Sequence, residues 1–290
     1  MRLNRAWILI IITALSSARS SSAITESMFG SDPISINDAI GYLEQAQKES
    51  RGDHLLYAKA TLEILRARDL HSLSGPAERT DLLTRARKDL ASAAKLGGET
   101  ADYHYLMAIL AIETDVDLPT ATSHLEKSIK AGPETDKVIE QLAILYEAQK
   151  RYQDAVRLLS ERVKSSENPQ LHHLLAVAYL YLEDHPHAEQ SAGKAVALGG
   201  GKEAQLVLAS AQSLSGHLTD AEATLRAVLA GDPGNRTALV GLADVLRKQG
   251  QTKAAQEVAS ELGRRYPDDK EIQTYLKGIA QSDSKSPAPH

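Results

Sequence analysis

The feature that most constrains this chain is a sequence motif that returns every 33 to 35 residues. Each copy contains a large apolar residue followed by Ala, and a further Ala in the next apolar segment. The pairs are Met107 with Ala108, Leu142 with Ala143, Leu175 with Ala176, Leu208 with Ala209 and Leu242 with Ala243, and the later residues are Ala121, Ala155, Ala188, Ala221 and Ala255. Within each copy apolar residues recur at helical spacing, and Gly, Pro and Asp fall at the breaks. Five copies in phase predict stacked helix pairs that bury their apolar faces against one another.

This pattern resembles the tetratricopeptide repeat, whose helix A carries a large and a small residue and whose helix B begins with Ala. The small residues let two antiparallel helices approach closely, while larger residues fill the layer between pairs. The family's Trp is missing from all five copies, and its aromatic position holds Tyr only at Tyr146 and Tyr179. The resemblance covers residues 101–268 and implies an all-α fold, a right-handed α-solenoid of antiparallel helix pairs.

Further helical patterns flank the five repeats. A looser pair is expected before them, with helices over 54–68 and 80–96 joined by a loop, and one more helix is expected over 36–48. After the repeats, a helix is expected to cover the last apolar face, and the Ser- and Pro-rich end is expected to be disordered. The predicted division is a signal peptide over 1–23, a flexible linker over 24–34, N-terminal helices with a degenerate repeat pair over 35–100, five repeats over 101–268, a capping helix over 269–281 and a disordered tail over 282–290.

The first residues have the order of a secretory signal peptide. Arg2 and Arg5 precede an apolar run over 6–15, and mostly small residues follow over 16–23. Cleavage after Ala18 and cleavage after Ala23 both fit. The alternative is an uncleaved anchor, but the run of about ten apolar residues is shorter than the ~20 that a spanning helix needs. No later segment is long and apolar enough to span, so no transmembrane span is expected in the mature chain.

The composition limits the cell compartments and the classes of partner that we expect for this chain. The chain has no Cys, which excludes a disulfide scaffold, thiolate metal sites and a Cys nucleophile. An exported chain of this size without Cys fits the bacterial periplasm or cell envelope best, with an extracellular location as the second interpretation. The net charge is −5, and it becomes more negative without the basic residues of 1–23. Nucleic-acid affinity depends on neutralising phosphates, so no nucleic-acid partner is expected.

The resemblance also implies where a partner would bind. In the family, defined positions of helix A line a concave groove that contacts the ligand. Matched residue by residue, these positions hold Tyr105, Ile109, Glu113, Lys137, Glu140, Ile144, Glu147, Gln170, His173, Val177, Tyr181, Glu203, Val207, Ser210, Asp244, Arg247 and Lys248. The predicted wall is apolar and lightly acidic in the middle and mixed in charge near the C-terminus. Such a wall suits an extended peptide or an amphipathic helix as the protein partner.

The sequence contains few signals of chemistry. It has no H-E-x-x-H, G-x-S-x-G or phosphate-loop motif, and we expect no catalytic residue and no cofactor. The glycines over 199–201 follow a predicted helix B, which indicates a left-handed helix end and a turn rather than a phosphate loop. Residues 183–187 read Glu-Asp-His-Pro-His. They have two interpretations, a solvated turn between helices or a weak metal site.

The sequence therefore leaves three hypotheses about function. The first is an exported, non-enzymatic interaction scaffold or assembly factor, placed by analogy to the family in a secretion, pilus or polysaccharide-export complex of a bacterial cell envelope. The alternative is a metal-dependent enzyme or metal-binding protein with its site near His172 to His187. The third is a chain that self-associates without any other ligand.

Overall fold

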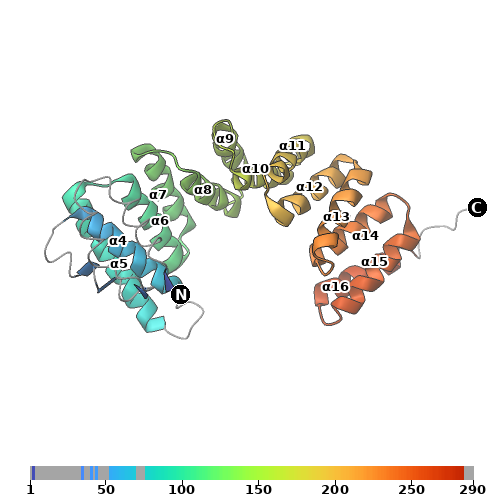
Figure 1. Ribbon diagram of the computed structural model, residues 1–290, viewed down its shortest axis with the longest axis horizontal. Helices are drawn as coiled ribbons and strands as arrows, with labels where there is room; N and C mark the ends of the chain where they lie inside the picture. Colours follow the sequence, from blue (N-terminus) through green and yellow to red (C-terminus); the bar gives the residue numbers. More distant parts are fainter. Residues whose placement is uncertain are drawn as a thin grey trace, which may run out of the picture. The chain divides into compact units, whose positions relative to one another are not determined.

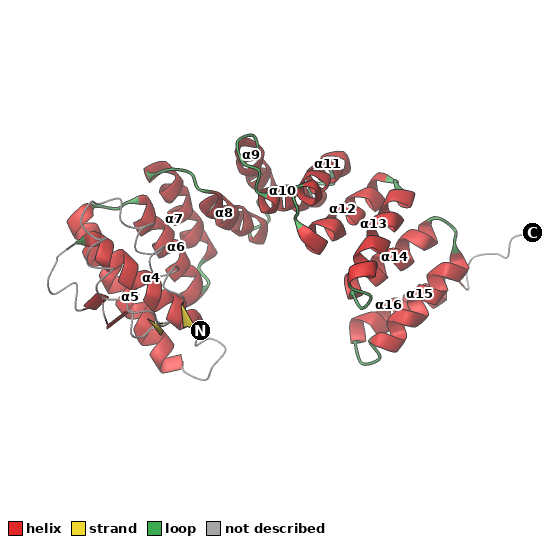
Figure 2. Ribbon diagram, viewed as in Figure 1, coloured by secondary structure: helices red, strands yellow, loops and turns green. Residues whose placement is uncertain are grey.

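The computed structural model describes residues 2–3, 34–35, 40–41, 43–44, 52–69 and 76–283. Most of the predicted signal peptide, the linker and the predicted helix over 36–48 lie outside these residues, as does the tail from residue 284 onward. Two short strands, Arg2–Leu3 (β1) and Ile34–Ser35 (β2), form an antiparallel pair that the sequence did not predict. Everything else assigned to an element in the described residues is helical, which confirms the predicted all-α fold class (Figure 2).

The chain divides into two compact units, Met1–Leu145 (unit 1) and Tyr146–His290 (unit 2). The long helices that begin in unit 1 are α4 (Asp53–Asp69), α5 (Pro76–Gly97), α6 (Ala101–Asp115), α7 (Leu118–Ala131) and α8 (Asp136–Ala148), whose last residues belong to unit 2. Within this unit, α4 packs on α5 and α6 packs on α7, and α6 also contacts α4 and α5. From α4 to α7, each helix thus packs against the next one in sequence, as in a solenoid (Figure 1).

Unit 2 repeats this arrangement. Its helices are α9 (Tyr152–Arg162), α10 (Pro169–Tyr181), α11 (His185–Ala197), α12 (Gly201–Ser215), α13 (Leu218–Gly231), α14 (Arg236–Lys248), α15 (Thr252–Arg265) and α16 (Lys270–Asp283). Consecutive helices pack on one another, and α10 with α12, and α12 with α14, are in contact as first helices of successive pairs. This is the stacked-hairpin arrangement expected of an α-solenoid.

The alanines of the repeated motif have the packing role that the sequence predicted. Ala176 and Ala188 are completely buried in the α10–α11 pair, and Ala209 and Ala221 are 2% and 0% exposed in the α12–α13 pair. Buried Leu side chains, among them Leu125, 0% exposed in α7, supply the bulk of the core. Close helix approach at Ala therefore replaces large aromatic side chains in the packing.

Side-chain caps fix where several helices begin. Asn235 precedes α14, and its side-chain oxygen accepts a hydrogen bond from the backbone N–H of Ala238, at 2.9 Å. Thr100 and Asp117 cap α6 and α7 in the same way. Asn235 is therefore the N-cap residue at which α14 begins.

Helix boundaries differ from the predicted ones where the ends carry small or polar residues. The predicted helices over 54–68 and 80–96 are α4 and α5, and α5 begins four residues earlier, at Pro76. Proline is favoured in the first turn of a helix because its missing N–H has no partner there in any case. The backbone of Gly199 and Gly201 has φ of +85° and +68°, which confirms the left-handed turn predicted there.

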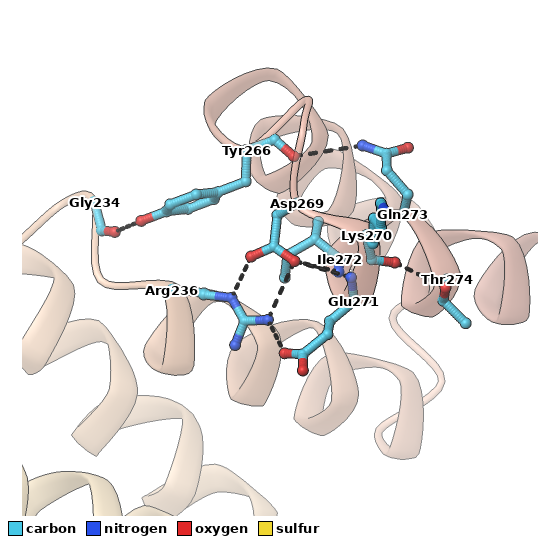
Figure 3. Close-up of polar contacts among 9 residues, drawn as sticks. All are labelled: Gly234, Arg236, Tyr266, Asp269, Lys270, Glu271, Ile272, Gln273 and Thr274. Atoms are coloured by element: carbon cyan, nitrogen blue, oxygen red, sulfur yellow. Dashed lines mark hydrogen bonds and ion pairs between the residues drawn. The ribbon is translucent and has the colours of Figure 1, made fainter.

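The last helix covers the C-terminal end of unit 2, where a capping helix was predicted. Ile272 of α16 is 1% exposed and packs with Leu239 and Leu262. Polar contacts hold the same helix, since Arg236 donates to Asp269, at 2.9 Å, and pairs with Glu271, at 2.7 Å (Figure 3). The helix continues to Asp283, two residues beyond the predicted cap.

Candidate partner-binding groove

The predicted groove residues lie on the first helices of successive pairs, namely α6, α8, α10, α12 and α14. The exposed ones are Lys137, Ile144, Gln170, Tyr181, Glu203, Ser210, Arg247 and Lys248. The partly buried ones are Tyr105, Glu113, Glu140, Glu147, His173, Val177, Val207 and Asp244. Ile109 differs from all of these, because it is only 5% exposed inside the core that α4, α5 and α6 share. It contributes to packing and offers a partner almost no surface.

Unit 1 carries a hollow of about 330 Å³ that two predicted groove residues line. Tyr105 of α6 and Lys137 of α8 face each other there, with the Lys137 ammonium 5.0 Å from the centre of the tyrosine ring. Such a distance allows a cation–π attraction. Leu106 and Val138 add apolar surface, and Thr61 of α4 adds a hydroxyl that the sequence did not point to.

Glu113, at the C-terminal end of α6, is used for internal contacts instead. Its carboxylate accepts hydrogen bonds from Arg68 of α4, at 2.5 Å, and from Arg79 of α5, at 3.0 Å. Arg79 also donates to the backbone carbonyl of Glu113, at 2.6 Å. Glu113 therefore joins three helices of unit 1, and its lone pairs are largely engaged.

Unit 2 carries a second hollow, of about 250 Å³, between α12 and α14. Its floor is apolar, with Leu206, Ala209, Leu225 and Val245, and Leu214 at its edge is 51% exposed. Its rim is polar, with Ser210, Ser213, Asp244 and Lys248. The structure thus brings Ser210, Asp244 and Lys248, three of the predicted groove residues, together at one opening.

Two polar residues of this rim are held in place by neighbours. The Lys248 ammonium donates to the Ser213 hydroxyl, at 2.9 Å, which links α14 to α12. Asp244 accepts a hydrogen bond from the Tyr275 hydroxyl of α16, also at 2.9 Å, and burial together with this contact raises the pKa of Tyr275. The capping helix therefore fixes the orientation of an acidic group on the groove side.

Elsewhere in unit 2, the surroundings of Glu147 and His173 disfavour the charged forms of both side chains. Burial raises the pKa of Glu147 to about 7, and its Oε1 atom is buried without a hydrogen-bond partner. Burial also lowers the pKa of His173, against the opposite effect of Glu203. Both side chains are therefore biased toward their neutral forms near pH 7.

An aromatic pair marks the same part of the chain. The rings of Tyr152 and Tyr181 are stacked, with centroids 4.5 Å apart and an angle of 6° between their planes. Tyr181 remains 62% exposed, so one of its ring surfaces is open to solvent. The sequence pointed to Tyr181 but not to Tyr152 of α9, because a helix-A position rule does not address helix B.

The histidine-rich turn is built differently from a metal site. Asp184 is the N-cap of α11, and its carboxylate oxygens both lie 2.8 Å from Nδ1 of His187. His185 and Pro186 belong to the first turn of that helix, so Leu182, Glu183 and the N-cap Asp184 form the connection to α10. Within 52–69 and 76–283, no group of three or more His, Asp or Glu side chains is arranged to hold a metal ion.

None of the helices in the described segments combines the length and the apolar character that crossing a bilayer requires.

Comparison with known proteins supports the repeat assignment. Residues 214–278 match the tetratricopeptide repeat family model. The Cellulose synthase 1 operon protein C of Komagataeibacter xylinus is 43% identical over 63 residues, which are 22% of this chain and 5% of that protein. The match therefore spans a small part of that relative's length.

Solved structures agree on the fold at low sequence identity. YrrB, described as a TPR protein with an unusual peptide-binding site, is 19% identical with a TM-score of 0.56, over 65% of this chain and 97% of that one. The type IV pilus biogenesis factor PilW is 15% identical with a TM-score of 0.59, over 75% and 98%. The C-terminal part of a repeat protein of Cytophaga hutchinsonii is 11% identical with a TM-score of 0.63, over 93% and 98%. No enzymatic family is indicated by these comparisons.

Proposed function

Because this chain carries tetratricopeptide repeats, we propose that it is a non-enzymatic scaffold whose first helices bind an extended peptide or amphipathic helix of a protein partner. The observation that carries the proposal is the hollow between α12 and α14, with its apolar floor and its rim of Ser210, Asp244 and Lys248. About 250 Å³ is small for a drug-sized ligand but suits an aliphatic side chain presented by a peptide.

The polar rim fixes the orientation in which such a peptide binds. A partner's apolar side chain would enter against Leu206 and Leu225, while its neighbouring polar groups meet Asp244 and Lys248. In peptide recognition, burial of apolar side chains usually supplies affinity, and polar contacts fix the orientation of the peptide. The hollow of unit 1, lined by Tyr105 and Lys137, likewise combines apolar surface with polar groups.

The experiment starts from the purified full chain. Peptides are selected from a displayed random library, and the dissociation constant of each is measured by fluorescence anisotropy. Ser210→Trp places a bulky ring at the rim of the hollow, and its matched control, Ala227→Trp, adds the same ring to an exposed position of α13. We expect Ser210→Trp to weaken binding by about tenfold or more, as for other central anchor positions, and Ala227→Trp to leave it unchanged.

The outcomes separate the alternatives. Selected peptides that bind both variants as they bind the wild type contradict the groove hypothesis. Sedimentation of the wild type and of Ser210→Trp tests self-association, because a concentration-dependent dimer that the substitution abolishes would mean that a second copy fills the hollow.

We further propose that the protein is exported and works in a bacterial cell-envelope complex of the secretion, pilus or polysaccharide-export type. The signal-peptide pattern of the first residues supports this, as do the pilus biogenesis factor and the cellulose synthase operon protein among the similar proteins. N-terminal sequencing of the protein isolated from its own cells should find a chain that begins after Ala18 or Ala23. A mature protein that retains Met1 and remains in the cytoplasmic fraction would contradict the export proposal.

A further inference from the structure

A separate pair of hollows flanks α11, the second helix of its pair. One, of about 510 Å³, lies where α9, α10 and α11 meet, and the other, of about 850 Å³, lies where α11 meets α12 and the start of α13. Gln190 and Gly193 of α11 line both hollows, so we treat the two as one trough across this helix, the α11 trough. None of its lining residues is a predicted groove residue. Figure 1 shows α9 and α11 on either side of α10.

The glycine at the centre of the trough is not explained by packing. Gly193 lies inside α11, where glycine lowers helix stability relative to Ala. A Cβ atom added at Gly193 would meet no other atom within 4 Å, and the backbone there does not have a positive φ. Neither close approach nor a turn therefore requires glycine at this position. Without a side chain, Gly193 leaves the part of α11 that the two hollows share uncovered.

The walls of the trough carry polar groups without partners. The hydroxyl oxygens of Ser160 and Ser215 and Nδ1 of His185 are buried without a hydrogen-bond partner, and their residues line the two hollows. Serine hydroxyls can turn about χ1, so these groups can reach a ligand that enters the trough. His172, only 8% exposed, lines the first hollow as well. Buried polar groups of this kind are normally satisfied, which points to a ligand rich in hydrogen-bonding groups.

The charges of the trough exclude an ionic ligand. Glu189 lies 2.9 Å from Nδ1 of His217, so its carboxylate is already paired. Burial and the nearby Lys194 lower the pKa of His172, which favours its neutral form. Lys194 is a single cation at the edge of the first hollow, whereas anion sites gather several donors. The other polar groups of the lining are amides, hydroxyls, imidazoles and a phenol, and Val163, Leu175 and Leu208 add apolar surface.

Aromatic surface lies next to these groups. The Tyr179 ring stacks on the His187 ring, with centroids 5.2 Å apart and planes at 25°, and both residues line the first hollow. The amide of Gln190 offers a donor and an acceptor, and Gln212, in the second hollow, offers its NH2 group, because its oxygen already accepts from the Thr224 hydroxyl, at 2.9 Å. We infer that the α11 trough binds a neutral saccharide chain, whose hydroxyls pair with these amides and hydroxyls and whose C–H faces pack on the rings.

A peptide is the rival ligand, and the trough fits it less well. A peptide that lies on helices is held by apolar anchor side chains, as proposed for the hollow between α12 and α14. In the trough the larger aliphatic side chains are Val163, Leu175 and Leu208, and they are divided between its two hollows. The trough therefore combines polar side chains with dispersed apolar surface, in place of the single apolar floor that a peptide anchor uses.

The test uses the glycine itself. Gly193→Leu fills the trough from a position whose Cβ has open space, so the variant should fold and should melt at or above the wild-type temperature. Gly278→Leu is the matched control, because Gly278 lies inside α16 and a Cβ there also meets nothing within 4 Å. Both variants of the full chain are titrated with cellohexaose, chitohexaose and maltohexaose, by calorimetry and saturation-transfer NMR.

We expect at least one hexasaccharide to bind the wild type and Gly278→Leu equally and to bind Gly193→Leu about tenfold more weakly or not at all. Gln190→Ala, which removes one amide and no backbone group, should weaken the same saccharide by about three- to tenfold. Failure of all three saccharides to bind the wild type overturns the inference, as does unchanged binding to Gly193→Leu. If Gly193→Leu instead weakens the peptides selected on the full chain, the trough is part of a protein interface and the saccharide assignment is wrong.

Discussion

Replacing Glu147 by Gln removes a carboxylate that the fold keeps away from water without compensation. Burial raises the pKa of Glu147 from 4.5 to about 7, and no other group contributes to this shift. The folded state therefore holds this proton more tightly than the unfolded state does. As pH rises from 4.5 to about 7, the unfolded state releases the proton first and the folded state loses stability.

The size of this penalty follows from the pKa difference. At 1.36 kcal/mol for each pKa unit, the rise from 4.5 to about 7 corresponds to about 3 kcal/mol. Because the side chain is only partly buried, solvent screening reduces the figure to about 1–2 kcal/mol. Glu147→Gln should therefore raise the free energy of unfolding by about 1–2 kcal/mol near pH 8 and leave it unchanged near pH 4.

Urea denaturation followed by far-UV circular dichroism measures this difference, since almost all of the described structure is helical. Glu134→Gln is the matched control, because Glu134 is exposed in the connection between α7 and α8. An equal free energy of unfolding for Glu147→Gln and wild type near pH 8 would refute the reasoning. So would a gain that persists near pH 4, because it would come from something other than the charge.

Other substitutions test the packing, a cap and a buried histidine pair. Ala221→Leu should lower the free energy of unfolding by about 1–3 kcal/mol through overpacking of the α12–α13 pair, whereas Ala227→Leu on the exposed face of α13 should be neutral or slightly stabilising in urea melts. Asn235→Ala should lose about 1 kcal/mol of stability with the N-cap of α14, and an unchanged urea midpoint would contradict the capping role. His104 and His124 lie 3.1 Å apart between their Nδ1 atoms, and burial lowers the pKa of both. The stability that this neutral pair contributes should be present above pH 6.5 and lost as the pH falls below it. His124→Gln should therefore make the melting temperature depend less on pH in this range.

The repeated motif predicted the elements correctly because its physical cause is local. A helix pair needs small residues where its two helices touch, and this requirement appears at fixed positions such as Ala176 and Ala188. The same logic places the start of α14 at Asn235, since a cap interacts with residues only three positions away. By contrast, nothing in the sequence predicts the start of α5 at Pro76, because Pro fits a loop as well as a first helical turn.

The candidate groove was predictable only as a set of positions. Family register assigned Ile109 and Ser210 the same role, yet Ile109 is 5% exposed in the core and Ser210 is exposed at the rim of a hollow. The difference depends on which side chains of neighbouring helices reach each position, and in unit 1 three helices enclose Ile109. Leu214, at the edge of the unit 2 hollow, belongs to no family groove position that the sequence identified.

What the sequence alone determined is the class of the fold and the order of its helices. Those follow from helical periodicity and from small residues at contact positions, which are properties of neighbouring residues in the chain. Only the tertiary structure determined which polar groups are buried away from water. Burial in the folded chain raises the pKa of Glu147, and packing brings Glu113 into contact with arginines of two other helices. At Gly193 the neighbouring side chains leave open space. Burial and open space are produced by the packing of several helices, and no single segment of sequence contains them.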